Sequence, residues 1–228
     1  MAKFEGLKWS SKQMRYGLAD KSYELLESDA KIAACSRSTN YAIFLAFEGI
    51  RFFCRKNASG GLEVVFLNWD KNLERFRRSM LFNIGKDSAP LVPTADELED
   101  ILADRFFREP AMRGLFEEMA AMGAQGYLRP FTVDEEQSIG VTFPNQPAIR
   151  ALASRYDQYL GEPFTGVVIP HLVRAVGLNG TGCLKLGVNY VMSVKAVEAA
   201  KTIDPSAAAA LFLDDQTHRP VEERHITE

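Results

Sequence analysis

Cysteine and histidine are scarce in this 228-residue sequence, which contains three of each. The cysteines at 35, 54 and 183 stand singly, so the sequence has neither a disulfide framework nor the paired cysteines of a zinc site. The histidines are isolated as well, and no His-Glu-x-x-His or phosphate-loop signature is present. We therefore expect no bound metal, a reducing cytoplasmic location and, if the protein is an enzyme, chemistry supplied by an organic cofactor.

The sequence also lacks an excess of charge of one sign and a long apolar run. Its 27 basic and 30 acidic residues give a formal net charge of −3, which provides no general attraction to nucleic acid or anionic lipid. The longest uncharged apolar runs, such as 42–47 and 207–213, are too short to span a bilayer. The first residues lack the apolar core of a secretory signal. These absences predict a protein with neither nucleic-acid nor membrane partners.

Apolar periodicity and turn residues predict a mixture of strands and helices. Strands are predicted at 41–54 (one strand or a pair), 62–67, 127–133 and 207–213. Helices are predicted at 68–84, 94–109, 110–122 and 189–202. The 57–61 turn joins the first two strand segments into a hairpin, and Pro130 favours an edge position or a strand end for the third. Thr94 and Glu97 have the spacing of a helix capping box.

Two lobes are indicated by a change in pattern after residue 144. The stretch from Pro144 to Pro170 is rich in proline and glycine and resembles a loop. Strands and helices intermix without a regular βαβ rhythm, so the predicted fold class is α+β, or mixed α/β. We expect a small N-terminal α/β domain over 1–150 and the start of a larger domain over 151–228.

The segment 180–190, GTGCLKLGVNY, places Lys185 in a glycine-rich loop directly before a predicted helix. Glycines on both sides allow a planar cofactor to approach the backbone, and a lysine amine becomes a useful nucleophile where its position is fixed. The alternative interpretation is an ordinary solvated lysine in a surface loop. The segment taken alone favours that alternative.

Five segments in order along the chain change this balance. Lys185-Leu186-Gly187-Val188-Asn189-Tyr190 resembles the cofactor-lysine segment of the branched-chain amino acid aminotransferases, which are class IV, fold-type IV enzymes dependent on pyridoxal 5′-phosphate. The other segments that resemble this family are 29–41, 47–51 (FEGIR), 73–79 (LERFRRS) and 126–130 (GYLRP). The resemblance implies a two-lobed fold with a small N-terminal lobe and a larger cofactor lobe.

The resemblance implies four cofactor-binding residues. Lys185 would bind pyridoxal 5′-phosphate covalently and carry the substrate's Cα proton, and Tyr190 would hydrogen-bond the phenolic oxygen of the cofactor. Arg75 would bind the phosphate; the alternative is a solvated arginine on a basic helix face. Glu223 would pair with the pyridine nitrogen, and Glu228 is a rival for that role.

The resemblance also implies a substrate side formed by Tyr127 and Arg129, with Tyr41 as a further pocket residue. The alternative for the first two is structural, with a packed tyrosine and an arginine paired to some acid. The spacing of Tyr41 is less regular, because one extra residue separates it from the FEGIR segment.

The activity implied is transamination of leucine, isoleucine or valine with 2-oxoglutarate in a cytoplasmic homodimer. The homodimer follows from the family, in which a loop of the partner's small lobe completes the pocket. Two alternatives stay open: another class IV activity, such as a D-amino acid aminotransferase or aminodeoxychorismate lyase, and a cofactor-free inactive scaffold. The family continues beyond the position of Glu228, so we expect a fragment or a C-terminally truncated relative.

Overall fold

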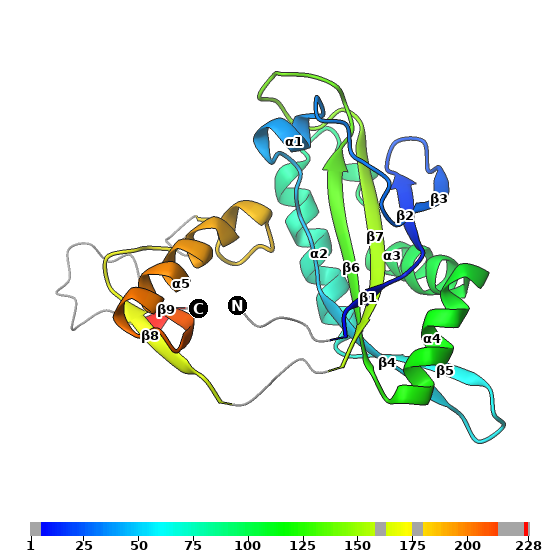
Figure 1. Ribbon diagram of the computed structural model, residues 1–228. Helices are drawn as coiled ribbons and strands as arrows, with labels where there is room; N and C mark the ends of the chain where they lie inside the picture. Colours follow the sequence, from blue (N-terminus) through cyan, green and yellow to red (C-terminus); the bar gives the residue numbers. More distant parts are fainter. Residues whose placement is uncertain (1–5, 158–162, 175–179, 214–225, 228) are drawn as a thin grey trace. The chain divides into compact units, whose positions relative to one another are not determined.

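The computed structural model describes residues 6–157, 163–174, 180–213 and 226–227, which belong to two compact units (Figure 1). The first unit spans Phe4–Tyr159, and the second takes the chain from Leu160 onward. The expected boundary at residue 150 would cut strand β7 (Pro147–Tyr156), so the division lies after that strand. The prediction of a loop over 144–170 is therefore wrong. Residues 147–156 of this stretch form β7, and β8 (Thr165–Ile169) follows in the second unit.

The first unit is built on one antiparallel sheet of seven strands (Figure 1). The strand order is β3-β2-β7-β6-β4-β5, and β1 pairs with β7. The remaining strands are β1 (Lys8–Trp9), β2 (Lys12–Gly17), β3 (Tyr23–Glu27), β4 (Ile50–Lys56), β5 (Leu62–Phe66) and β6 (Gln125–Asp134). The β6–β7 ladder runs from Gln125 opposite Tyr156 to Asp134 opposite Pro147. This pair forms the centre of the sheet, and the predicted hairpin is confirmed as β4–β5.

Helices of different lengths accompany the sheet. They are α1 (Arg37–Tyr41), α2 (Trp69–Asn83), α3 (Ala95–Glu99) and α4 (Pro110–Met122), with a short 3₁₀ turn at Ala89–Leu91. The predicted helices at 68–84 and 110–122 are confirmed as α2 and α4. Thr94 caps α3 as predicted, because its hydroxyl accepts from the Glu97 backbone N–H while Glu97 bonds back to the Thr94 N–H. The expected single helix 94–109 instead changes to a π-helical turn at Asp100–Arg105 and a 3₁₀ turn at Phe106–Arg108.

The core of the first unit lies between the sheet and its helices. Alternate residues of β6 are fully buried, including Leu128, whereas Tyr127 and Arg129 are half-buried on the opposite face. On the core face, the Phe52 ring lies 5.0 Å from that of Phe107 and 5.7 Å from that of Phe116, measured between centroids. The fold therefore presents Tyr127 and Arg129 on the sheet face away from this aromatic core.

Two strand predictions near the site are wrong. Residues 41–49 are not the start of a strand, because Tyr41 ends α1 and β4 begins at Ile50. Pro130 lies neither at an edge nor at a strand end, because β6 pairs with both β4 and β7 and continues to Asp134. The Pro130 carbonyl accepts from the Glu48 N–H at 2.9 Å, so the Pro130 nitrogen faces the residues that precede β4. A missing N–H is tolerated where the ladder is already broken.

Within its described residues, the second unit combines a three-stranded sheet with one helix. The strand order is β10 (Ile226–Thr227), β9 (Ala207–Leu213), β8, with β8 and β9 parallel. Helix α5 (Val191–Ile203) follows a 3₁₀ turn at Gly187–Tyr190. Its Ala200 packs with Ile169 and Ala207 in a small buried cluster. The predicted helix at 189–202 and strand at 207–213 are confirmed.

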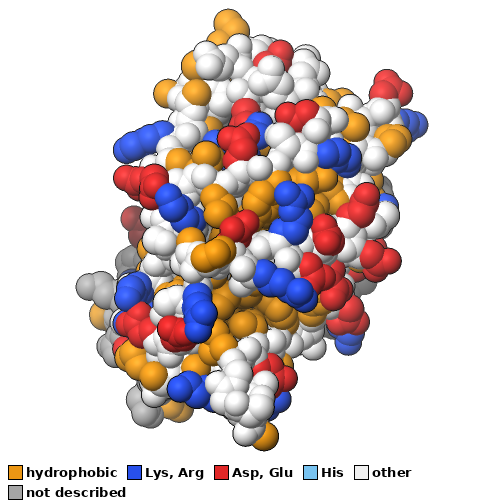
Figure 2. Space-filling view, turned by 90° about the vertical axis from the view of Figure 1, so that its right-hand side faces the viewer, with side chains coloured by type: hydrophobic (Ala, Val, Ile, Leu, Met, Phe, Trp, Pro, Cys, Tyr) orange, Lys and Arg blue, Asp and Glu red, His pale blue; other side chains and the backbone are white. Residues whose placement is uncertain are grey.

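The surface mixes charges of both signs. Figure 2 shows lysine and arginine side chains interspersed with aspartate and glutamate over the face that it presents. Within the described residues, no helix combines the length and the apolar character needed to cross a membrane.

Candidate functional site

Lys185 lies in the second unit, between the buried Leu184 and Leu186 and directly before the 187–190 turn. Its ammonium group donates to the Tyr190 hydroxyl at 2.8 Å, and Nζ lies 5.3 Å from the centroid of the same ring. The turn brings the two side chains together, because it folds the chain back within five residues. The structure thus joins two of the residues expected to bind a cofactor.

Asn189 braces this segment, a role that the sequence analysis did not assign. Its buried Nδ2 donates to the Thr181 carbonyl at 2.8 Å and to the Leu184 carbonyl at 3.0 Å. Its Oδ1 accepts from the Thr181 hydroxyl at 2.6 Å. Three hydrogen bonds therefore close the loop from which Lys185 extends. The sequence did contain a signal for this role, because Asn189 lies within the segment 185–190 that resembles the cofactor-lysine segment of the family.

Two glutamates are candidates for the carboxylate expected at the pyridine nitrogen. Glu223 and its rival Glu228 both lie outside the described residues. The neighbouring pair Ile226–Thr227 forms β10, which is antiparallel to β9. The choice between the two glutamates stays a prediction from the sequence.

Arg75 lies on α2 in the first unit and forms a two-pronged ion pair with Glu48. Its Nε and Nη2 each lie 2.7 Å from a carboxylate oxygen of Glu48. The Glu48 side chain is 0% exposed, whereas that of Arg75 is 43% exposed. The Gly49 N–H also donates to Glu48, at 2.8 Å. The alternative of a simply solvated Arg75 is therefore wrong, since a buried carboxylate fixes the plane of its guanidinium.

Arg75 also borders an open hollow along α2. The other residues that line it are charged: Asp70, Lys71, Glu74 and Arg78. The hollow thus presents cations and carboxylates together.

Tyr127 and Arg129 of β6 contact each other and the segment that carries Glu48. Arg129 donates to the Tyr127 hydroxyl at 2.7 Å, and its guanidinium carbon lies 4.6 Å from the centroid of the Phe47 ring. A Cβ added at Gly49 would lie 1.8 Å from the Tyr127 hydroxyl oxygen. We name Phe47, Glu48, Gly49, Arg75, Tyr127 and Arg129 the β6 cluster. It unites three of the predicted site residues within one unit.

Replacing Gly49 with alanine is expected to displace the Tyr127 phenol, because the new methyl group would overlap it. A forced overlap of this kind costs about 1–3 kcal/mol of folding free energy, measurable by urea unfolding. In a Tyr127→Ala background, which lacks the phenol that the new methyl group would overlap, Gly49→Ala should cost much less. Gly114→Ala is the matched control, since an added Cβ there meets nothing within 4 Å and α4 gains helix propensity. Equal effects of the two glycine changes would contradict this packing.

Tyr41 lies at the end of α1 in the same unit and is exposed. Its hydroxyl donates to the Ile139 carbonyl at 2.7 Å. The structure therefore places Tyr41 against the segment that follows β6.

Two further observations concern metal ligands and thiols among the described residues. They contain no group of three or more His, Cys, Asp or Glu side chains placed to hold a metal ion. Burial raises the pKa of the Cys54 thiol to about 12, so little nucleophilic thiolate forms there at neutral pH. The chemically useful groups are the Lys185 amine and the Tyr190 phenol in the second unit and, separately, the guanidinium groups of Arg75 and Arg129 in the first.

Comparison with known proteins gives structural likeness without sequence likeness. No protein-family model matches the sequence, and no curated protein is similar to it. Among solved structures, the branched-chain aminotransferase of Thermobaculum terrenum in its PLP form matches with a TM-score of 0.65 and 16% identity, over 91% of this chain and 60% of that chain. The enzyme of the archaeon Thermoproteus uzoniensis with norvaline matches with a TM-score of 0.61 and 19% identity, over 90% and 61%.

A third structure, the branched-chain amino acid aminotransferase of Escherichia coli, has a TM-score of 0.59 and 18% identity. It aligns over 93% of this chain and 60% of that chain. The chain thus spans about 60% of the length of the solved structures that it matches. These likenesses show that the chain has the fold of the aligned part of fold-type IV aminotransferases, which confirms the predicted fold class.

Proposed function

We propose that this chain is the lysine-bearing part of a pyridoxal 5′-phosphate-dependent aminotransferase that exchanges amino groups between branched-chain amino acids and 2-oxoglutarate. The observation that carries the proposal is the 2.8 Å hydrogen bond between the Lys185 amine and the Tyr190 hydroxyl. This bond lies in a braced loop whose sequence resembles the cofactor-lysine segment of that family. The likeness to solved aminotransferase structures supports the same proposal.

The residues present fit the chemical groups of this cofactor. An aldehyde needs an amine, a phosphate needs a cation and a phenolic oxygen needs a hydrogen-bond donor. Lys185 would hold the aldehyde carbon, Arg75 the phosphate and Tyr190 the phenolic oxygen, and Glu223 would pair with the ring nitrogen. When bound, pyridoxal phosphate supplies the electron sink for the substrate Cα carbanion.

Arg75 suits a phosphate because its guanidinium is planar, permanently charged and already oriented. The two 2.7 Å contacts with Glu48 fix its plane. A preoriented group loses less freedom on binding an anion than a mobile lysine does.

Proton transfer is the task of Lys185 itself. Transamination removes the proton from the substrate Cα and returns it to a different carbon, so one amine that stays in place can serve both steps. The Tyr190 hydroxyl orients that amine, and the three Asn189 hydrogen bonds restrict the backbone that carries it. Restricting the amine in this way favours repeated transfer between fixed positions.

Tyr127 and Arg129 of the β6 cluster would recognise the substrate. A guanidinium held over the Phe47 ring, 4.6 Å from its centroid, offers charge for a carboxylate beside apolar surface for an aliphatic side chain. Tyr127 orients Arg129, and Tyr41 would extend the pocket. The proposal includes a cytoplasmic homodimer, as the resemblance implies, and the three cysteines are free thiols, which suits a reducing compartment.

The activity is tested by loading the chain with pyridoxal phosphate and recording its visible absorbance after adding L-leucine. We expect the band of the lysine-bound cofactor to disappear and then to return on adding 2-oxoglutarate. A visible absorbance that changes with neither leucine nor glutamate would contradict the proposed substrates.

Matched donors separate the alternatives in the same experiment. If D-alanine removes the absorbance band and is converted to pyruvate, the result would favour a D-amino acid aminotransferase. Pyruvate released from aminodeoxychorismate would favour the lyase. A chain that acquires no absorbance at all would favour a cofactor-free scaffold.

A further inference from the structure

Arg37, the first residue of α1, is an almost completely buried cation, with its side chain 3% exposed. Its Nε lies 3.0 Å from Asp134 Oδ2, and its Nη2 forms an ion pair with Glu136. Its Nη1 donates to the Gly140 carbonyl at 3.0 Å and to the Thr142 hydroxyl. One side chain therefore contacts both ends of the segment that follows β6.

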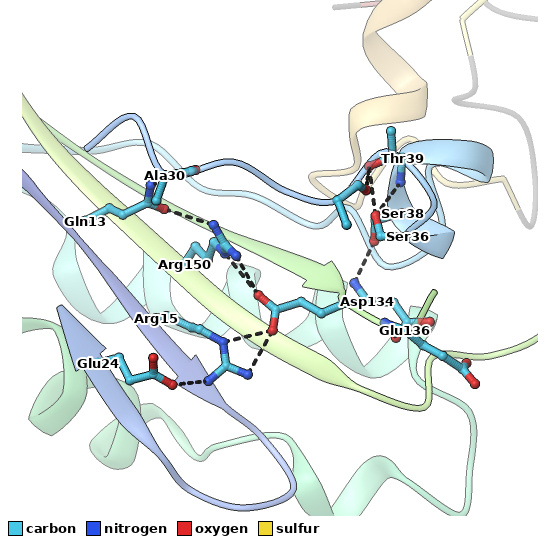
Figure 3. Close-up of polar contacts among 12 residues, drawn as sticks. Gln13, Arg15, Glu24, Ala30, Ser36, Ser38, Thr39, Asp134, Glu136 and Arg150 are labelled. Atoms are coloured by element: carbon cyan, nitrogen blue, oxygen red, sulfur yellow. Dashed lines mark hydrogen bonds and ion pairs between the residues drawn. The ribbon is translucent and has the colours of Figure 1, made fainter. Parts of the chain in front are cut away.

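Further hydrogen bonds join α1 to the same segment. The Asp134 N–H donates to the Ser38 hydroxyl at 2.6 Å (Figure 3), and the Arg37 N–H donates to the Glu136 carbonyl at 3.0 Å. At the other end of α1, the Tyr41 hydroxyl donates to the Ile139 carbonyl at 2.7 Å. We name Arg37–Tyr41 together with 134–142 the α1 latch.

The base of the latch is anchored separately. Glu135, between the two carboxylates that Arg37 binds, accepts from Arg15 of β2 and Arg150 of β7, each at 2.8 Å. Arg15 is bound in turn by Glu24 (Figure 3). The end of β6 is thus fixed to the sheet without Arg37. The specific contribution of Arg37 is to hold the segment beyond that end, and with it Tyr41.

The held segment and the residue directly after it expose apolar side chains to solvent. Ile139 is 82% exposed, Val141 75% and Phe143 60%. Apolar side chains in a loose loop lower their free energy by collapsing onto nearby apolar surface, whereas the latch keeps them extended. A buried arginine is costly to desolvate and is better explained by a need to specify one geometry than by added stability.

We propose that Arg37 is a positioning residue that fixes Tyr41 for substrate binding. This inference rests on the proposed function, in which Tyr41 lines the substrate side. Arg37 acts through the latch: the α1 backbone begins at Arg37 and ends at Tyr41, and both side chains are bonded to the same nine-residue segment, 134–142. Lysine would keep the charge but lose the fork that reaches two carboxylates, a carbonyl and a hydroxyl together.

The test uses the pyridoxal phosphate-loaded chain with Arg37→Met, Arg37→Lys, Tyr41→Phe and the double variant Arg37→Lys/Tyr41→Phe. We expect Arg37→Met and Arg37→Lys to speed amide hydrogen exchange over 136–143 and to weaken leucine binding about tenfold or more. Borohydride trapping at Lys185 should stay unchanged. In the double variant the two losses of leucine affinity should be clearly non-additive, because both changes release the same latch.

Arg55→Met is the control, because it removes an exposed arginine paired with Glu63 at 2.7 Å. It should change neither the exchange over 136–143 nor leucine affinity. Should Arg37→Met fail to fold, Thr142→Val removes one Arg37 acceptor at the exposed edge of the latch and must still combine non-additively with Tyr41→Phe.

Unchanged leucine affinity in the Arg37 variants, or strictly additive losses, would overturn the inference while leaving the proposed function intact. If leucine leaves the absorbance of the loaded wild-type chain unchanged, the result would instead contradict the proposed function, and with it the substrate role of Arg37. Amide hydrogen exchange over 136–143 distinguishes the two results, because it measures how firmly the α1 latch is held in the absence of substrate.

Discussion

Replacing Lys185 with alanine is expected to abolish covalent cofactor attachment and to lower transamination by a factor on the order of 10³ or more. The lysine supplies both the covalent anchor and the proton carrier, so no neighbour replaces it. The fold should survive, because Asn189 braces the loop through Thr181 and Leu184 rather than through the lysine side chain.

Lys195→Ala is the matched control for this experiment. Lys195 lies ten residues further along the chain, is exposed on α5 and forms a 2.7 Å ion pair with Glu198. Its loss should leave cofactor attachment and turnover unchanged, since an exposed pair contributes about 0–1 kcal/mol. Turnover that persists in Lys185→Ala would show that the amine is not the catalytic group.

Arg75→Ala is expected to weaken pyridoxal phosphate binding by roughly 2–4 kcal/mol, about 30- to 1,000-fold in the dissociation constant. Excess cofactor should partly restore the loaded state. The structure adds a second effect, because the change leaves the buried Glu48 carboxylate without its arginine. We expect a loss of about 1–3 kcal/mol in unfolding free energy as well.

A double variant separates these two effects of Arg75. Arg75→Ala/Glu48→Gln removes the stranded charge, so it should recover most of the unfolding free energy but none of the cofactor affinity. Arg113→Ala, which deletes an exposed arginine paired with Glu117 at 2.8 Å, should alter neither quantity. Recovery of cofactor affinity in the double variant would mean that Arg75 is a structural partner of Glu48 and does not bind the phosphate.

The parts of the fold that the sequence predicts well are those specified locally. The apolar residues of α2 and α4 recur at helical spacing, and Thr94 lies three residues from Glu97, its partner in the capping box. Each of these signals is contained in a short stretch of sequence. Lys185 and Tyr190 are likewise joined by a single turn. Sequence reasoning could therefore identify this half of the candidate site.

The features that the sequence does not predict depend on contacts between distant residues. Glu48 and Arg75 are 27 positions apart, and Arg37 and Glu136 are 99 apart. Each of these charged residues, taken alone, resembles an ordinary surface residue. The sequence does not predict β7, because the prolines at 144, 147 and 163 and the glycine at 161 resemble a loop, whereas the ladder with β6 places this strand at the centre of the sheet.

The most direct test of the account is borohydride reduction of the chain incubated with pyridoxal phosphate, followed by peptide mass spectrometry. Reduction fixes the cofactor to whichever lysine holds it. The account predicts a stoichiometric phosphopyridoxyl group on the peptide that contains Lys185, absent from Lys185→Ala and from the Lys195 peptide. A wild-type chain with no modified lysine, or with the label spread over surface lysines, would contradict it.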